Sequence, residues 1–205
     1  MQNKLVNFTK QSIFDLIKGS IFAGLLIAIA GIFYVRSADP VIGSILFGLG
    51  LTSVIILDAN LFTGKIGYVN SLQTATEAGI ILVFNLLAAA IVGLLYHYIV
   101  WPIELFEVTR LIKDPIQMFY RGLICGVCIY LAVELYKRTK NLIPVFVAVA
   151  AFILTGGTHC IADTFYFFAG PFSWAGLGYV GLTILGNTFG AILMNLFVKE
   201  IKVGK

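Results

Sequence analysis

Two short polar stretches interrupt long apolar runs and hold the residues that could do chemistry. The first contains Asp58 and Thr63, and the second contains His159 and Asp163. An imidazole titrates near neutral pH, so His159 can give or take a proton. His159 and Asp163 are four residues apart, a spacing that puts both on one face of a helix and would suit an acid–base pair or two metal ligands. The sequence offers no third ligand nearby and no activated nucleophile, which counts against a membrane-embedded enzyme, and we expect no metal and no cofactor.

The composition indicates a membrane protein. Hydrophobic residues make up 60% of the 205 residues and charged residues 12%, whereas soluble domains average about 25% charged residues. Too little charge remains to coat a soluble surface, which excludes a soluble globule and a disordered chain. The net charge of +4 comes from basic residues that flank apolar runs, so we expect no nucleic-acid partner. The three cysteines lie inside apolar runs and predict no disulfide framework.

Six membrane-spanning helices are expected, because the chain has room for six at about 30 residues per helix and loop. The second and the fifth are broken by the polar stretches, which lie at 58–65 and 155–163. Each half of the chain, about 12–100 and about 116–199, then has a broken span in its middle. The expected spans are about 14–35, 41–57 with a continuation past the break, 78–100, 116–135, 142–169 and 177–198.

The two halves are expected to be inverted repeats within one transmembrane domain, residues 1–205. An odd number of spans per half gives the halves opposite orientations, and broken helices that meet near the midplane are a recurring plan of channels and transporters. Broken backbone at this depth persists only where it lines a cavity or is buried in protein. The breaks therefore mark the expected pathway. The last span of each half carries a lone asparagine, Asn85 or Asn187, which we expect to hydrogen-bond neighbouring helices or the broken backbone.

Basic residues are distributed unevenly between the two sides of the expected membrane. With six spans, ten of them lie on the side that carries both termini, and three or four lie on the other side. Cytoplasmic loops carry the excess of lysine and arginine, so both termini should be cytoplasmic. We expect an integral protein of a bacterial or archaeal plasma membrane, in contact with lipid.

Four motifs, in order along nearly the whole chain, resemble those of the formate/nitrite transporter family. They are Leu-Phe-Thr at 61–63, Phe-Tyr-Arg-Gly-Leu-Ile-Cys at 119–125, Gly-Thr-His-Cys-Ile-Ala-Asp at 157–163 and Leu-Gly-Asn-Thr-Phe-Gly at 185–190. The resemblance implies an all-α, aquaporin-like protomer and a homopentamer. It also implies one pore per protomer for a small monovalent anion such as formate, nitrite or hydrosulfide.

The resemblance further implies which apolar side chains constrict the pore. Phe47 and Leu51, with Leu61 or Phe62, would form one constriction. Phe152, seven residues before the central histidine, would form the other with a neighbour.

Three positions depart from the family's pattern. Asn60 and Thr158 stand where the family has glutamate, and Asp163 stands where it has asparagine. We expect all three to be structural, although an acid inside the membrane, such as Asp163, is also a functional candidate. At the outer mouth, Arg110 aligns with the family's lysine and Lys113 is the nearby lysine. Either could be the cation that attracts the anion.

Desolvation indicates how such an anion could cross. A bare anion in a low-dielectric slit costs tens of kcal/mol before relaxation. Protonating a carboxylate of pKa about 4 at pH 7 costs only roughly 4 kcal/mol. We therefore hypothesise that His159 supplies or relays a proton and that Thr63 orients the anion opposite it. The alternative is an aquaporin-like channel for small neutral solutes. The Asn-Pro-Ala signatures of aquaporins are absent from the sequence, which counts against this alternative.

Overall fold

The computed structural model describes residues 13–100 and 114–199, and all regular elements in these ranges are helical. The α-helices are α1 (Ile13–Arg36), α2 (Pro40–Ile56), α3 (Phe62–Lys65), α4 (Leu72–Ile99), α6 (Pro115–Thr139), α7 (Ile143–Leu154), α8 (Cys160–Ala169) and α9 (Trp174–Val198), and a short 3₁₀ helix, η1 (Ile66–Tyr68), follows α3.

Among the described residues, four helices are long and apolar enough to cross a membrane. These are α1, α4, α6 and α9, of 24 to 28 residues, and a hydrocarbon core of about 30 Å needs about 20 residues of helix. Helices α2, α7 and α8 are apolar but shorter, at 17, 12 and 10 residues. This confirms the expected helical membrane class.

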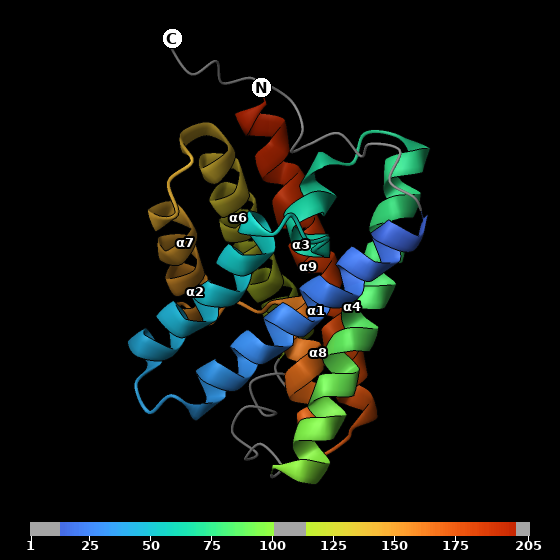
Figure 1. Cartoon of the computed structure of the whole chain (residues 1–205), viewed down its shortest axis with the longest axis vertical. Coiled ribbons are helices and arrows are strands. Elements are labelled where there is room, and N and C mark those ends of the chain that lie inside the picture. The colour runs from blue at the N-terminus through green and yellow to red at the C-terminus, as the bar shows by residue number, and fades with distance from the viewer. Residues whose placement is uncertain (1–12, 101–113, 200–205) are drawn as a thin grey trace.

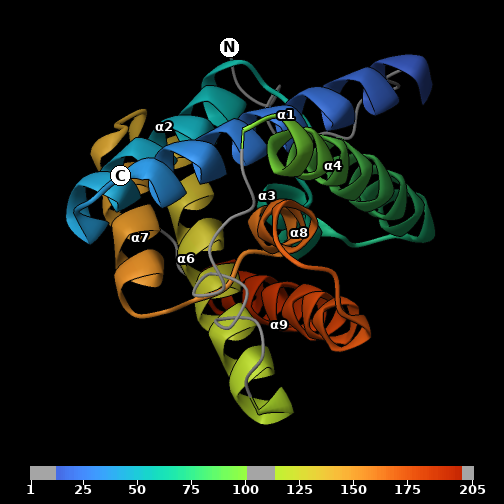
Figure 2. The ribbon, with the colours of Figure 1, turned by 90° about the horizontal axis from the view of Figure 1, so that it is seen from below.

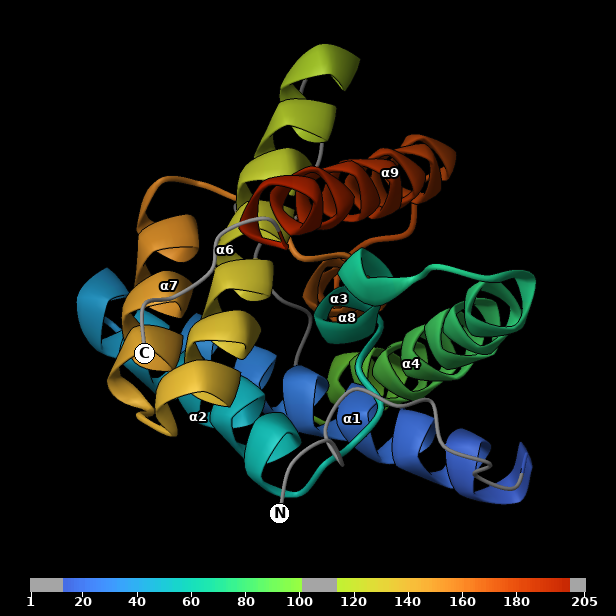
Figure 3. The ribbon, with the colours of Figure 1, turned by 90° about the horizontal axis from the view of Figure 1, so that it is seen from above.

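The two short helices α3 and α8 lie one above the other in the middle of the molecule (Figure 1). Seen from below, α8 is enclosed by the longer helices, and from above α3 covers it (Figures 2 and 3). Helix α1 packs against α4 and α2, α6 packs against α9 and α7, and α2 and α7 join the two groups.

Helices α2 and α6 begin with the same local device. Asp39 accepts hydrogen bonds from the two N–H groups that follow Pro40. Asp114 does the same for the two N–H groups that follow Pro115. An aspartate N-cap with proline at the first helical position satisfies orphan backbone donors and presets the backbone angle, so these sequences fix where the helices start.

Helices α2 and α7 also end alike. Leu57 and Thr155 close them with φ of −87° and −84°, and the next residues have positive φ, 51° at Asp58 and 79° at Gly156. A left-handed residue terminates a helix, and glycine and aspartate tolerate that conformation better than most residues. The non-helical segments are therefore 57–61 and 155–159. Both are shorter than the predicted breaks at 58–65 and 155–163, because residues 62–65 already belong to α3 and residues 160–163 to α8.

Glycines let the long helices approach closely. A Cβ added at Gly24 of α1 would lie 2.6 Å from the backbone oxygen of Asn85 on α4. A Cβ at Gly126 of α6 would meet the backbone oxygen of Asn187 on α9. Small residues permit this close backbone contact between helices in membranes. The close contact brings Asn85 and Asn187 near the breaks to which they hydrogen-bond.

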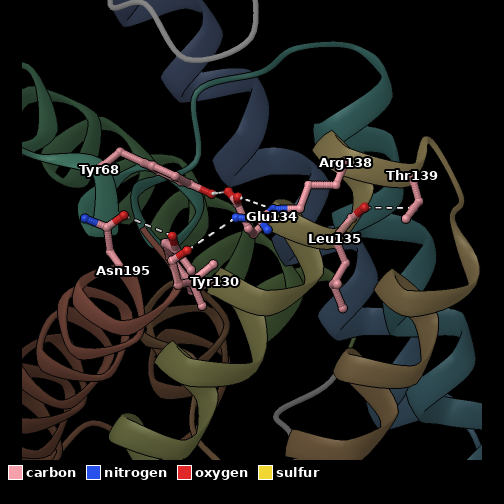
Figure 4. A network of polar contacts seen from close by, with 8 residues as sticks. Tyr68, Tyr130, Glu134, Leu135, Arg138, Thr139 and Asn195 are labelled. Carbon is pink, nitrogen blue, oxygen red and sulfur yellow. Dashed lines mark hydrogen bonds and ion pairs between the residues drawn. The ribbon is translucent and has the colours of Figure 1, made fainter. Parts of the chain in front are cut away.

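A polar network at one end ties η1 to α6 and α9 (Figure 4). Glu134 accepts hydrogen bonds from the hydroxyl of Tyr68 at 2.8 Å and from Nε of Arg138 at 2.7 Å. The Tyr68 ring lies 5.1 Å from that of Tyr130, whose hydroxyl donates to Asn195 at 2.9 Å. The segment after α3 is thereby fixed against the long helices.

Candidate functional site

The two breaks come together in the middle of the molecule, where α3 and α8 begin. Oγ1 of Thr63, in the first turn of α3, lies 2.9 Å from Nε2 of His159, the residue before α8. Both side chains are buried, with 1% and 2% of their surface exposed. A contact between residues 96 positions apart thus joins the two halves of the chain.

The hydrogen bonds of His159 define its tautomer. Its Nδ1 accepts from the backbone N–H of Ala162 at 3.4 Å and so caps α8. Since a backbone N–H can only donate, Nδ1 carries the lone pair, and the neutral ring carries its hydrogen on Nε2. Nε2 then donates to Thr63, which leaves the hydroxyl hydrogen of Thr63 for a bound molecule.

Asn85 holds the first break. Its side-chain oxygen accepts from the backbone N–H of Phe62 at 2.9 Å. Its amide nitrogen donates to the backbone oxygens of Ser20 and Asn60 at 2.6 and 2.9 Å. The bonds to Phe62 and Asn60 satisfy backbone groups that the broken helix leaves without helical partners, and the bond to Ser20 ties the break to α1.

Asn187 makes the same bonds at the second break. It accepts from the N–H of Cys160 at 3.0 Å and donates to the backbone oxygens of Gly122 and Thr158 at 2.8 and 2.9 Å. These contacts, like those of Asn85, fit the structural role expected for both asparagines.

The side chains of Asn60 and Thr158 have polar partners inside the protein. Asn60 donates to the backbone oxygen of Leu16 at 3.3 Å and accepts from Nζ of Lys65 at 2.6 Å. Thr158 accepts from the hydroxyl of Thr183 at 3.4 Å. Each residue is at most 5% exposed, so both contribute to the packing around the breaks.

Phe47 and Phe152 form one aromatic cluster with His159. Their rings lie 6.2 Å apart, and each lies within 6.4 Å of the imidazole. The expectation that they belong to two separate constrictions was therefore wrong. Packing of α2 against α7 brings the two rings together on the same side of the histidine.

Leu51, Leu61 and Phe62 lie in the main hydrophobic core and are at most 4% exposed. Leu61 precedes α3 in an extended conformation, as His159 precedes α8. The first half of the chain thus presents an apolar residue where the second half presents an imidazole.

A cavity of about 30 Å³ lies beside the aromatic cluster. His159 and Asp163 both line it, as do the phenol side chains of Tyr34 and Tyr166. The sequence reasoning missed these tyrosines, because a tyrosine near the end of a span is ordinarily an interfacial anchor. Only the packing of α1 against α8 indicates their place.

Two expected site residues, Arg110 and Lys113, lie outside the described residues. In the part that the structure describes, no group of three histidine, cysteine or acidic side chains could hold a metal ion.

Comparisons with known proteins show what this chain is similar to. A family model described as formate/nitrite transporter matches residues 1–199. The nitrite transporter NirC of Escherichia coli (strain K12) is 28% identical over 195 residues, covering 78% of this chain and 70% of its own. NirC of Salmonella typhimurium is 27% identical over the same coverage.

Solved structures share the fold. An FNT family ion channel superposes with a TM-score of 0.81 at 22% identity, covering 91% of this chain and 89% of its own. A pentameric formate channel with formate bound superposes with a TM-score of 0.70 at 20% identity, covering 91% and 94%.

Proposed function

This chain belongs to the formate/nitrite transporter family, and we propose that it conducts small monovalent anions of weak acids, of the formate, nitrite or hydrosulfide type. It is an integral membrane protein with the fold of ion channels in this family. Its relatives are transporters, so the chain is not an enzyme.

We propose that six spans form two inverted repeats, about 12–100 and 116–199, within one domain. Helix α2 with α3 would be the broken second span, and α7 with α8 the broken fifth. The matched positive-φ residues after α2 and α7 and the matched asparagine bonds from α4 and α9 support this arrangement.

The hydrogen bond between Thr63 and His159 carries the proposal for the pathway. It brings an imidazole and a hydroxyl together where the two breaks meet among apolar side chains, and the imidazole would exchange protons there. An anion bound there would accept a hydrogen bond from the Thr63 hydroxyl. A proton that reaches the anion through His159 would then neutralise it. Once neutral, it passes apolar residues at the modest cost of burying a polar group.

Apolar side chains would keep the pathway dry on both sides of the histidine. Phe47 and Phe152 would form the gate on the side of the cavity, and Leu51 with Leu61 or Phe62 the gate on the side of α3. Arg110 or Lys113 would attract the anion at the outer mouth.

The proposed assembly is a homopentamer, as in the similar formate channel, whose description names it pentameric. Many large apolar side chains of the outer helices are exposed on the single chain, and lipid or neighbouring protomers would cover them. Both termini would face the cytoplasm of a bacterial or archaeal cell.

Flux into proteoliposomes tests the proposed function. Formate, nitrite and hydrosulfide should enter much faster than into empty vesicles and faster at lower external pH, while glycerol should not. Glycerol flux without anion flux would instead favour the channel for neutral solutes.

A further inference from the structure

The side chain of Arg121 lies beside the second break, and the proposed transport step does not use it. Arg121 is in the second turn of α6, a helix long enough to cross a membrane, and is half-buried. Ionisable side chains are rare inside membrane-spanning helices, where they commonly mark the pathway of an ion or a substrate. The contacts of Arg121 therefore decide whether its role is structural.

The guanidinium group of Arg121 lies flat against the backbone of Gly156. A Cβ at Gly156 would lie 3.7 Å from the central carbon of this group and 3.8 Å from both terminal nitrogens. These nearly equal distances mean that the plane of the guanidinium faces the glycine. Because the N–H groups of a guanidinium lie in its plane, they point past Gly156 and not at it.

No protein acceptor holds these N–H groups in the part of the chain that the structure describes. An arginine near the end of a helix can bond the last carbonyls of that helix, but the last carbonyls of α7 already have other partners. The oxygen of Phe152 accepts from the N–H of Gly157 at 2.6 Å. The oxygen of Ala151 accepts from the N–H of Thr155 at 3.1 Å. Within residues 13–100 and 114–199, the Arg121 guanidinium has neither a hydrogen bond nor an ion pair.

Arg121 also stands next to the cavity beside His159. Gly157 and Thr158 line that cavity, and they follow Gly156 directly in the chain. The N–H of Thr158 donates to the backbone oxygen of Arg121 at 3.3 Å, which fixes this turn of α6 against the break. The side chain of Arg121 is outside the described lining. It is therefore a cation at the edge of the cavity.

The shape of a guanidinium distinguishes between anions. Its N–H groups form a rigid planar fork that bonds both oxygens of a carboxylate at once, whereas the ammonium group of lysine acts as a compact point charge. Formate and nitrite each carry two oxygens on one central atom, in the same arrangement as a carboxylate. Hydrosulfide has a single sulfur atom and cannot accept two parallel hydrogen bonds on separate atoms.

From this geometry, and resting on the proposed channel function, we propose that Arg121 is a recognition site for planar oxyanions. Its guanidinium binds both oxygens of formate or nitrite at the edge of the cavity, before the anion meets His159. Hydrosulfide experiences the same charge but lacks the second hydrogen bond. Arg121 thus favours two-oxygen anions over hydrosulfide when all of them are scarce.

The test compares the wild type with Arg121→Lys in proteoliposomes, because lysine keeps the positive charge and removes the fork. Arg138→Lys is the matched control: it makes the same change near the other end of α6, where Arg138 pairs with Glu134. Influx of formate, nitrite and hydrosulfide is measured separately over a range of concentrations at one external pH. The half-saturating concentration of each anion is the readout.

Arg121→Lys should raise the half-saturating concentrations of formate and nitrite about tenfold, because one charge-assisted hydrogen bond is lost. The value for hydrosulfide should stay within about twofold of that of the wild type, because the charge remains. Arg138→Lys should match the wild type for all three anions.

An equal change for the three anions in Arg121→Lys, or no change for any of them, would overturn the recognition role and leave the channel function intact. A lipid phosphate bound at Arg121 would give the second of these outcomes, together with a lower unfolding temperature of the variant. Absence of flux of all three anions in the wild type would instead overturn the channel function.

If Arg121→Lys fails to assemble, chemical modification of the wild type decides. Phenylglyoxal reacts with guanidinium groups, and mass spectrometry of peptides locates the modified arginines. Formate must protect Arg121 from modification, chloride at the same concentration must protect it less, and Arg138 must react equally in both. Equal modification of Arg121 with and without formate overturns the proposal.

Discussion

At the scale of residues, the central pair is unusual because both members are buried and come from distant parts of the chain. His159 caps α8 through Nδ1 and bonds Thr63 through Nε2. The ring therefore has one orientation and one neutral tautomer. A fixed ring suits proton exchange with a molecule held at Thr63, because the proton donor and the acceptor are already in the correct orientation.

Replacing His159 by phenylalanine should reduce anion flux at least about tenfold, because the ring that bonds Thr63 would lose both of the nitrogens that can exchange a proton. Initial rates of formate influx at pH 6 measure the change. His97→Phe, in the last turn of α4 where the ring contacts the backbone oxygen of Ala169, is the matched control. Wild-type flux in His159→Phe would remove the imidazole from the mechanism.

Thr63→Val should leave the Nε2 hydrogen of His159 without its acceptor. A buried unsatisfied donor costs about 1–3 kcal/mol, so the variant should unfold at a lower temperature and conduct more slowly. Thr76→Val changes the same residue type at an exposed site on α4 and should do neither. Equal flux in Thr63→Val and the wild type would show that the hydroxyl does not position the anion.

At the scale of elements, the breaks are held by side chains rather than by helix continuity. The first and last turns of a helix carry backbone groups without helical partners. Helix α3 has only four residues, so most of its backbone groups are of this kind. Asn85 and Asn187 each satisfy three such groups or neighbouring carbonyls. The geometry of the two breaks therefore depends on one asparagine from α4 and one from α9.

Asn85→Leu and Asn187→Leu should each destabilise the protein by several kcal/mol, because about 1–3 kcal/mol is lost for each buried polar group left unpaired. Thermal unfolding in detergent measures the effect. Asn195→Leu is the control and should cost less, since among the described residues the Asn195 side chain accepts one hydrogen bond, from Tyr130. Equal unfolding temperatures for all three variants would argue against the holding role of Asn85 and Asn187.

At the scale of the whole molecule, the single chain leaves an apolar surface on its outer helices. Large side chains that are at least 40% exposed include Leu46, Leu49, Val83, Leu87, Ile91, Leu185 and Phe189. Lipid covers such a surface as well as protein does, so helices associate in membranes by close packing rather than by a hydrophobic drive.

We expect the purified protein to contain five copies, as the formate channel that shares its fold does by its description. Native mass spectrometry in mild detergent measures the number of chains. A monomer that nevertheless transports anions in proteoliposomes would show that each protomer holds a complete pathway and that assembly is dispensable.

The sequence by itself determined the helical membrane class, the family and the positions of both polar stretches. These properties are local: they follow from the length of apolar runs, from the residues that stop helices and from short motifs. The ends of α2 and α7 were predictable in this way, because polar residues with glycine or aspartate follow each apolar run.

Only the tertiary structure decided which side chains meet. It paired Thr63 with His159, placed Phe47 beside Phe152 instead of in a separate constriction, and put Asp163 in a cavity with Tyr34. These contacts join residues from different helices, and they depend on how closely those helices pack and at what rotation. A pattern read along one helix contains no information about the neighbour that its face will meet.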